Sequence, residues 1–349
     1  LDRELGTLLQ EIEIGHDPAH VMTRVDTEQV HVGLNGEDGV MELNRDPATG
    51  LLKKHRVISM QDPDPKKRTN PTQPHAHWMG HDGATMATPN ANTADSSLFD
   101  FDEDKVVSKL PTGALSIAVG MMPDSSKYYV SNYLGHSLSV INMNSLPPSK
   151  VGDNISLLLG YNPITGSTSV IPTSSVPACI AAAGAPCPIG GLPVQTPVSP
   201  DGKFVITGNT LGGTITIFDI GLGQVVKVLP CDPGCHGVQY GAKAGAGYFA
   251  YVTSKFANRL IVLDYDPDNN GIATDARIAG SVLLVKNNAP SDDTITGNYG
   301  MGGQGVMPIP NIYNGWVQKL GSDWCGQLSA GQKTPFPGTT TPATCNANP

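Results

Sequence analysis

Residues 198–209 read VSPDGKFVITGN, and residues 213–219 continue with GTITIFD. The Asp-Gly pair at 201–202 is a strong turn signal, because glycine reaches the positive φ angles that a tight hairpin needs. Apolar and polar residues alternate on both sides of this pair, which is the period of a β-strand. The stretch therefore predicts a strand, a tight turn, a second strand, a short turn and a third strand.

The same pattern recurs along the chain, and six repeats can be recognised. In each repeat, a strand rich in β-branched, aromatic or hydroxyl residues is followed, after a short gap, by another strand. The other repeats read MPDSSKYYVSN and SLSVIN (122–132, 137–142), GYFAYVTS and RLIVLD (247–254, 259–264), EQVHVGLN and GVMELN (28–35, 39–44), HDGATMATPN and SLFDF (81–90, 97–101), and GVMPIP and GWVQ (305–310, 315–318).

Repeats of this length cannot bury their own apolar faces, so neighbouring units must stack on one another. Sheets of about four antiparallel strands around a channel satisfy this requirement. We therefore expect an all-β fold, a β-propeller with six or seven four-stranded blades, as a single domain over residues 1–320. The Pro-, Ser- and Gly-rich segment 145–192 is expected to be a long insertion between blades, and residues 321–349 an irregular C-terminal strap.

Two of the strands carry a recognisable motif. Residues 129–132 read YVSN and residues 251–254 read YVTS, and a Pro-Asp-Gly turn stands at 200–202. In these features the chain resembles the YVTN family of β-propellers, over roughly residues 15–316. The resemblance implies the propeller fold and says almost nothing about function, because one fold serves many activities.

Composition narrows the class of partner. The formal net charge is −9 and the isoelectric point is near 5.4, so the basic face that a nucleic-acid partner requires is not expected. No run of 18 or more apolar residues is present, so no transmembrane segment is predicted. The chain starts at Leu1, which we interpret as the start of a processed or truncated mature chain.

The six cysteines form three pairs that are close in sequence and lie in loop-like segments. An even number of locally paired cysteines predicts disulfide bonds and an oxidising compartment, so a secreted or periplasmic protein. Free thiols of a cytosolic protein are the alternative. The expected pairs are Cys179 with Cys187, Cys231 with Cys235, and Cys325 with Cys345.

Histidines gather at the starts of the repeats. His75, His77 and Met79 alternate along a segment expected to be an innermost strand, so their side chains share one face. Imidazole and thioether groups are ligands suited to copper, and imidazole also suits zinc and iron. This segment therefore predicts a metal site at the channel.

Further histidines are expected on the same face of the propeller. His236 opens the innermost strand of another blade at the position that matches His75, His20 lies near that position in a third blade, and His136 lies in a turn expected to rise on the same face. The arrangement is similar to that of the nitrous oxide reductase propeller, which implies copper held by histidines at the channel mouth. The alternative is that these histidines are unrelated and bond to backbone groups in turns.

Cys231, Cys235 and His236 allow a different cofactor. Their spacing, Cys-x-x-x-Cys-His, is one residue longer than the usual attachment motif of a c-type haem. A covalent haem with His236 as axial ligand, and Met79 or another histidine as the second, is one interpretation. A small disulfide loop that braces the start of a blade is the favoured one.

An Asp- and Asn-rich loop follows one of the strands. Its alternating oxygen atoms, with a glycine after them, resemble the first half of a calcium-binding loop, although Arg277 replaces the closing glutamate. A turn without a metal ion is the alternative. The expected calcium ligands are Asp264, Asp266, Asp268, Asn270 and Asp275.

Two classes of function follow from these patterns. The leading hypothesis is a secreted or periplasmic metal-binding propeller, with copper and a redox role, whose partner is a small-molecule substrate or a redox protein. Such a protein would be a copper-dependent oxidoreductase. The rival is a non-catalytic interaction propeller in a larger extracellular assembly, which would make its contacts through segment 145–192 and its acidic surface.

Overall fold

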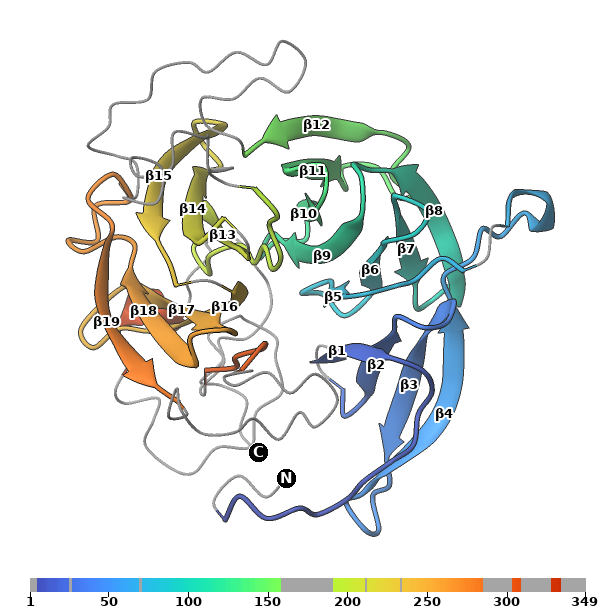
Figure 1. Cartoon of the computed structure of the whole chain (residues 1–349). Helices are drawn as coiled ribbons and strands as arrows, with labels where there is room; N and C mark the ends of the chain where they lie inside the picture. The colour runs from blue at the N-terminus through green and yellow to red at the C-terminus, as the bar shows by residue number, and fades with distance from the viewer. Residues whose placement is uncertain are drawn as a thin grey trace.

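The described strands of this computed structural model form five antiparallel sheets that stand side by side around a central channel (Figure 1). The structure describes residues 5–24, 27–68, 71–157, 191–210, 212–232, 234–284, 303–308 and 328–333. Each sheet is one blade, and its strands follow one another in sequence from the channel outward. The chain is therefore a β-propeller, as the repeats predict.

The first two blades come from the N-terminal part of the chain. The strands of blade 1 are β1 (Pro18–Thr23), β2 (Val30–Leu34), β3 (Gly39–Arg45) and β4 (Leu52–Ser59), and those of blade 2 are β5 (Trp78–Met79), β6 (Thr85–Asn90), β7 (Asp95–Asp100) and β8 (Lys105–Pro111). A short 3-10 helix, η1 (Pro65–Lys67), lies in the connection between them.

The remaining blades complete the described part of the ring. Blade 3 has β9 (Ser116–Met121), β10 (Lys127–Asn132), β11 (Ser137–Asn142) and β12 (Val151–Ser156). Blade 4 has β13 (Phe204–Asn209), β14 (Thr214–Asp219) and β15 (Gln224–Pro230). Blade 5 has β16 (Cys235–Ala242), β17 (Tyr248–Ser254), β18 (Arg259–Asp264) and β19 (Arg277–Leu283). In blade 4, residues 193–198 take the place next to the channel and attach through two isolated bridges, Pro193 with Asn209 and Val198 with Val205.

The core lies between the blades, because neighbouring blades cover each other's faces. Strands β6 and β13 are buried at every position, whereas the outermost strand β19 is exposed at every position. A strand buried on both faces has to hide its polar residues as well as its apolar ones, so these residues must find partners inside the protein.

Buried asparagines meet this need in three consecutive blades. Asn90, Asn132 and Asn209 end the second strand of blades 2, 3 and 4, and none of them is exposed. The side-chain amide of each donates hydrogen bonds of 2.6–3.0 Å to the residues five and seven positions later, on the next strand. The acceptors are Asp95 and Ser97, Ser137 and Ser139, and Thr214 and Thr216.

The prediction of six or seven blades was wrong, because the described residues contain five. The sixth repeat was expected at 305–318. Its described part, within 303–308, has no strand and is fixed to blade 5 by side chains: Gln304 O accepts hydrogen bonds of 3.0 Å from the His236 ring and from Thr253 Oγ1. Two glycines and a proline in these six residues weaken a strand ladder, and residues 309–318 lie outside the described residues.

The segments predicted to be irregular are described only in part. Strand β12 lies inside segment 145–192 and forms the outer strand of blade 3, while residues 158–190 lie outside the described residues. Within 321–349 the structure describes residues 328–333, which include the helix α1 (Ala330–Lys333). Gln332 Nε2 donates to Lys243 O and Gly247 O at 2.6 and 2.7 Å, which ties this segment to blade 5.

None of the helices in the described residues has the length and apolar character needed to cross a bilayer.

We predict that Asn209→Ala lowers the free energy of unfolding by about 2–3 kcal/mol, because it removes three buried hydrogen bonds: two that Asn209 donates to Thr214 and Thr216, and one that it accepts from Thr207. Urea unfolding at neutral pH measures the change. Asn142→Ala is the control: Asn142 ends β11, is half-buried and makes no side-chain hydrogen bond among the described residues. Its effect should stay within about 0.5 kcal/mol; equal losses for both variants would contradict the role given to Asn209.

Candidate functional site

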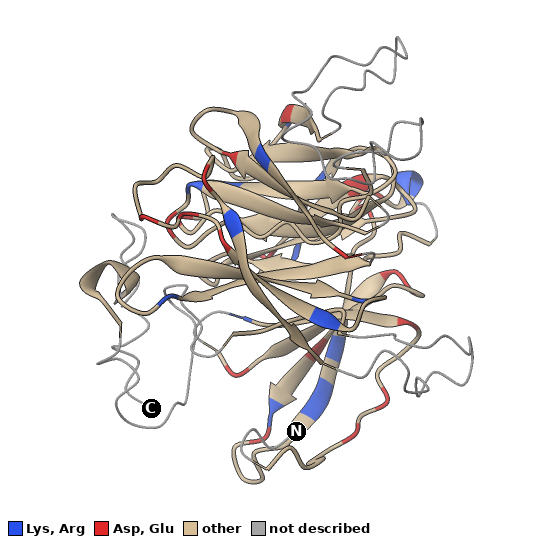
Figure 2. Cartoon of the chain, turned by 60° about the vertical axis from the view of Figure 1, so that its left-hand side comes forward, with Lys and Arg blue, Asp and Glu red and all other residues tan. Residues whose placement is uncertain are grey.

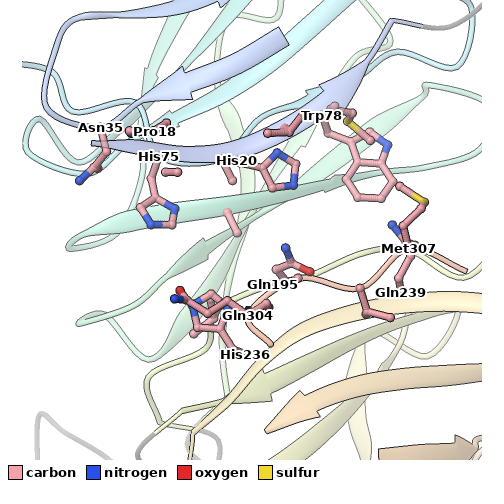
Figure 3. Close-up of a pocket in the computed structure, with 18 of the residues that line it drawn as sticks. Pro18, His20, Asn35, His75, Trp78, Gln195, His236, Gln239, Gln304 and Met307 are labelled. Carbon is pink, nitrogen blue, oxygen red and sulfur yellow. Dashed lines mark hydrogen bonds between the residues drawn. The ribbon is translucent and has the colours of Figure 1, made fainter. Parts of the chain in front are cut away.

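A cavity of about 870 Å³ occupies the centre of the ring (Figure 3). All five blades contribute to its wall, and residues 304–307 close it between blades 1 and 5. Figure 3 shows His20 and His75 on one side of the cavity and His236 with Gln304 on the opposite side. Three of the predicted site histidines therefore face one space, as expected from their places in the repeats.

Two of these histidines lie where the pairing of neighbouring strands is irregular. The register of β1 with β2 shifts between Pro18 and Val21, and the register of β16 with β17 shifts between Cys235 and Val238. A bulge of this kind re-aims the side chains within it and is frequent beside functional sites. His20 and His236 lie in these two irregularities, at corresponding places in blades 1 and 5.

The proton positions on two rings follow from their partners. His75 Nδ1 lies 3.0 Å from Ile117 O, and His236 Nδ1 lies 3.0 Å from Gln304 O. A carbonyl oxygen can only accept, so Nδ1 carries the proton in both rings and Nε2 keeps its lone pair. Burial lowers the pKa of His75, and burial together with nearby His75 and Lys255 lowers that of His236 to about 4, so both rings are neutral at pH 7.

The cavity wall is polar but nearly uncharged. Its polar side chains, besides the histidines, are Asn35 and three glutamines, and Asp17 is the one carboxylate. No lysine or arginine is among the described residues that line it. Figure 2 shows where the charges lie instead: acidic residues mostly in the loops, and basic residues along outer strands such as β4.

A second group of histidines lies behind the wall, between blades 1 and 2. The His20 ring contacts the edge of the His77 ring at a centroid distance of 5.1 Å, and His77 lies 6.5 Å from His31. His31 Nε2 lies 3.1 Å from a carboxylate oxygen of Glu42, its cross-strand neighbour on β3. His31, Glu42 and His77 are at most 1% exposed.

Burial and neighbouring groups shift the pKa values of His77, His20 and Glu42 downward. Burial, and then the neighbours His20 and His31, hold the pKa of His77 well below its usual value, against a weaker opposing effect of the His31 backbone. Burial and the neighbour His75 lower the pKa of His20 to about 4. Burial raises the pKa of Glu42, but the hydrogen bond and charge of His31 and the charge of Arg56 outweigh it and keep this pKa below its usual value.

The other predicted ligands lie elsewhere. Met79 is fully buried in the apolar core and does not line the cavity. His136 lies in the turn after β10, where its Nδ1 accepts a 3.0 Å hydrogen bond from Leu192 N. Within the described part of the chain, no three His, Cys, Asp or Glu side chains already converge closely enough to hold one metal ion. The predicted copper site therefore stays a prediction.

One of the three predicted disulfides lies in the described residues. Cys231 and Cys235 are bonded, with Cα atoms 6.4 Å apart, which is within the range that a disulfide spans. The bond uses both sulfurs that a covalent haem would require, so the structure favours the disulfide interpretation of this motif. The pairs Cys179–Cys187 and Cys325–Cys345 lie outside the described residues.

A lysine occupies the centre of the predicted calcium loop. Lys243 Nζ donates to Asp264 Oδ1 at 3.0 Å and to the carbonyl oxygens of Asp266 and Pro267 at 3.2 and 3.3 Å. The Asp266 carboxylate accepts from the backbone N–H groups of residues 270 and 271. The Asn270 side chain donates to Asp268 and accepts from Ile272 N. The oxygen atoms expected to bind calcium are thus largely engaged within the protein, and calcium binding stays a prediction.

Sequence reasoning missed the partners of these histidines. His31 and Glu42 stand in the weakest of the recognised repeats, and Gln195 and Gln304 in segments without a strand pattern. One signal for such a partner was present in the sequence: the polar residue His31 stands between Val30 and Val32. Both faces of this strand are covered in a propeller, so a polar side chain there needs a partner inside the protein.

No protein-family model matches the chain, and no curated protein matches its sequence. Solved structures share its fold at low identity. A functionally unknown protein from Desulfotomaculum acetoxidans gives a TM-score of 0.56 at 11% identity, over 83% of this chain and 75% of that one. A putative 6-phosphogluconolactonase from Bacteroides fragilis gives 0.55 at 14%, over 78% and 72%, and the periplasmic gluconolactonase of Pseudomonas aeruginosa gives 0.54 at 16%, over 76% and 70%. These likenesses show the β-propeller fold alone.

We predict that Lys243→Met lowers the free energy of unfolding by about 3 kcal/mol, because it leaves the nearly buried carboxylate of Asp264 without its closest cation. Thermal unfolding, measured without calcium and with about 1 mM CaCl2, gives the change in stability. Calcium should raise the Tm of the variant by more than that of the wild type, because Lys243 donates to the same loop oxygen atoms that would bind the ion. An equal rise in both proteins would show that calcium binds despite Lys243.

We also predict that the protein loses stability as the pH falls from about 6.5 to 4. Burial, against weaker effects of Met121 and Asp124, lowers the pKa of His81 to about 4, so the unfolded chain binds a proton in this window that the folded chain does not. The loss from His81 amounts to at most about 3 kcal/mol. His81→Asn should make the pH dependence of urea unfolding shallower; parallel profiles for variant and wild type would contradict this.

Proposed function

We propose that the chain binds an uncharged, hydroxyl-bearing small molecule in its central channel, with a sugar lactone as the substrate class that it hydrolyses. The observation that carries the proposal is the pair of neutral imidazoles, His75 and His236, which present unprotonated Nε2 atoms at opposite sides of one polar cavity. A cavity with a few convergent polar groups is the usual form of a small-molecule site.

The charge of the wall selects the class of ligand. A phosphorylated or carboxylated molecule requires basic side chains, and none lines the described wall of this cavity. Amide groups such as those of Gln195 and Gln239 both donate and accept, as hydroxyl groups and a lactone carbonyl do. Two of the proteins with this fold are named as a gluconolactonase or a putative phosphogluconolactonase, and the uncharged lactone fits this wall better than the phosphorylated one.

The tautomer of His236 suits it to general-base catalysis. Its Nε2 can take a proton from a water molecule while the water oxygen adds to the lactone carbonyl. When the ring C–O bond breaks, the proton returns to the leaving oxygen, and a hydroxy acid is released. Gln304 O holds the Nδ1 proton and so fixes the orientation of the ring during both transfers.

The disulfide supports a location in an oxidising compartment, and we propose that the protein is secreted or periplasmic. We also propose that it is a member of the YVTN-type propellers. The motif residues 129–132 and 251–254 form the ends of the second strands of blades 3 and 5, which is where a shared blade architecture requires the same residue types.

Copper-dependent redox chemistry is the second candidate, on one specific observation. Histidines that bind metals commonly donate their other ring N–H to a backbone carbonyl, as His75 and His236 do. An interaction propeller without a small-molecule ligand is the third interpretation, and it gives no role to these two hydrogen bonds.

We predict that the protein accelerates hydrolysis of δ-gluconolactone above the spontaneous rate, and does so more efficiently than for its 6-phosphate, as measured in a pH-stat. His236→Asn should lower kcat/KM by roughly 100-fold, the usual size of a lost general base. Because the pKa of His236 is about 4, kcat/KM should already be independent of pH above about 5.

The control variant is His55→Asn. His55 lies on the outer strand β4 and its side chain is 51% exposed, so its loss should leave hydrolysis unchanged. Calorimetric titration of the wild type with the lactone and with Cu²⁺ separates the candidates. Binding of copper without the lactone would favour the redox candidate, and binding of neither would leave the interaction propeller.

A further inference from the structure

Gln195 lies in the cavity wall, on the innermost segment of blade 4. Its side-chain oxygen Oε1 accepts a 2.8 Å hydrogen bond from Val238 N, and its backbone N–H donates to His236 O at 3.4 Å. Both partners belong to β16 of blade 5, at the irregular pairing of this strand. The side chain of Gln195 thus supplies an acceptor to a backbone N–H of the neighbouring blade, which every buried N–H requires.

The bond to Val238 fixes which end of the Gln195 amide faces the cavity. A backbone N–H needs an acceptor, so the oxygen of the amide lies beside Val238 and the NH2 group occupies the other position. Among the described residues, Gln195 Nε2 makes no hydrogen bond. Figure 3 shows this nitrogen turned into the space between His20 and His236. The cavity therefore meets a donor at Gln195, and the amide cannot turn round without losing its bond to Val238.

The segment that carries Gln195 is held from two sides. The hydroxyl group of Tyr240 on β16 donates to Pro197 O at 3.2 Å. On the other side, Gly120 of β9 packs so closely against Thr196 O that a methyl group at residue 120 would overlap this oxygen. Blades 3 and 5 thus position the segment between them. A donor that is held in place in this way needs no reorganisation to stabilise a charge that develops in front of it.

Two features distinguish Gln195 from the other amides of the wall. Its oxygen is bonded to a different blade, and its backbone is bonded to the residue proposed as general base. Gln239 accepts only from the N–H of the next residue, Tyr240, at 3.2 Å. The side chains of Gln304 and Asn35 make no hydrogen bond within the described part of the chain. Gln195 is therefore the amide whose donor has a fixed direction beside His236.

We infer that Gln195 Nε2 binds the carbonyl oxygen of the ligand, so that the channel selects ring compounds with a carbonyl group over cyclic polyols without one. The inference rests on the proposed lactone hydrolysis and names the group by which the substrate is recognised. His75 and His236 use their N–H groups on backbone carbonyls and present acceptors to the cavity. Hydroxyl groups can donate to these acceptors, whereas a carbonyl oxygen only accepts and needs the donor of Gln195.

The same bond has a role in the proposed reaction. When the water oxygen adds to the carbonyl carbon, the electron pair of the C=O π bond moves to the carbonyl oxygen, and the Gln195 N–H stabilises the negative charge there. His236 meanwhile holds the proton taken from the water. When the pair returns and the C=O bond forms again, the ring C–O bond breaks and His236 gives its proton to the leaving oxygen. One water is added to one lactone, and no further reactant is consumed.

Calorimetry on the full chain tests the binding step with two ligands. One is δ-gluconolactam, whose carbonyl is a strong acceptor and which resists hydrolysis; the other is anhydroglucitol, the same ring without the carbonyl. The wild type should bind the lactam at least about 10-fold more tightly, because the ether ring leaves the amide N–H unpaired. Gln195→Glu keeps an acceptor for Val238 but replaces the donor by oxygen, so it should lose this preference. Gln195→Met, which adds no charge, should lose it too, and thermal melting shows that both variants are folded.

The lactone assay tests the reaction step. Gln195→Glu should lower kcat by roughly 100-fold with a smaller change in KM, as expected for a donor that acts mainly on the transition state. Gln224→Glu is the matched control, because it makes the same substitution at an exposed position at the start of β15 in the same blade; it should leave binding and hydrolysis unchanged. His236→Asn removes the base but not the donor, so it should keep the preference for the lactam while it lowers kcat/KM.

The outcomes separate this inference from the proposed reaction. Equal affinity of the wild type for the two rings, binding of neither ring, or a lactam preference that survives in both Gln195 variants would overturn the inference. Hydrolysis of the lactone at an unchanged rate in these variants would also overturn it and leave the reaction standing. A lactam preference that depends on Gln195, in a wild type that does not hydrolyse the lactone, would support the inference and remove the proposed reaction.

Discussion

Hydrogen bonds from a buried amide to the next strand are the constraint on which blades 2, 3 and 4 depend. Blades that stack on both faces leave the middle strands no access to water, so any polar group there must be paired internally. Asn132 and Asn209 do this for their blades by reaching two hydroxyl groups on the following strand. The interior does not follow this requirement everywhere: among the described residues, Thr88 Oγ1, Thr196 Oγ1 and both side-chain polar atoms of Asn258 are buried without a hydrogen-bond partner.

Local signals in the sequence predicted the strands and turns within the described blades, although not the number of blades. The Pro-Asp-Gly turn forms as expected: Gly202 takes a φ of 73°, and the Ser199 hydroxyl accepts from Phe204 N at 2.9 Å. Strands β13 and β14 follow it as predicted, and they pair antiparallel from Phe204 with Asp219 to Asn209 with Thr214. The convergence of His20, His75 and His236 on one channel was predicted in the same way, because equivalent positions of repeated units meet around the axis.

Features that depend on contacts between distant segments could not be predicted. Residues 303–308 carry a plausible repeat start, yet they form no strand and cross the channel side of blade 5, where Gln304 O meets His236 and Thr253. The role of Glu42 depends on its pairing with His31, which only the register of β2 and β3 defines. Lys243 likewise reaches the acidic loop from the turn between β16 and β17, a contact that the composition of the loop alone does not reveal.

Blade 4 differs from the others in its innermost segment. Residues 193–198 are held to β13 by two isolated bridges and not by a continuous ladder, although Gln195 belongs to the cavity wall. Single backbone hydrogen bonds hold this segment on two sides: Val194 N donates to Gly208 O on β13 at 2.9 Å, and Gln195 N donates to His236 O on β16 at 3.4 Å. The innermost residues of blade 4 therefore also link blade 4 to blade 5, and they join Gln195 of the cavity wall directly to the backbone of His236 on the same wall.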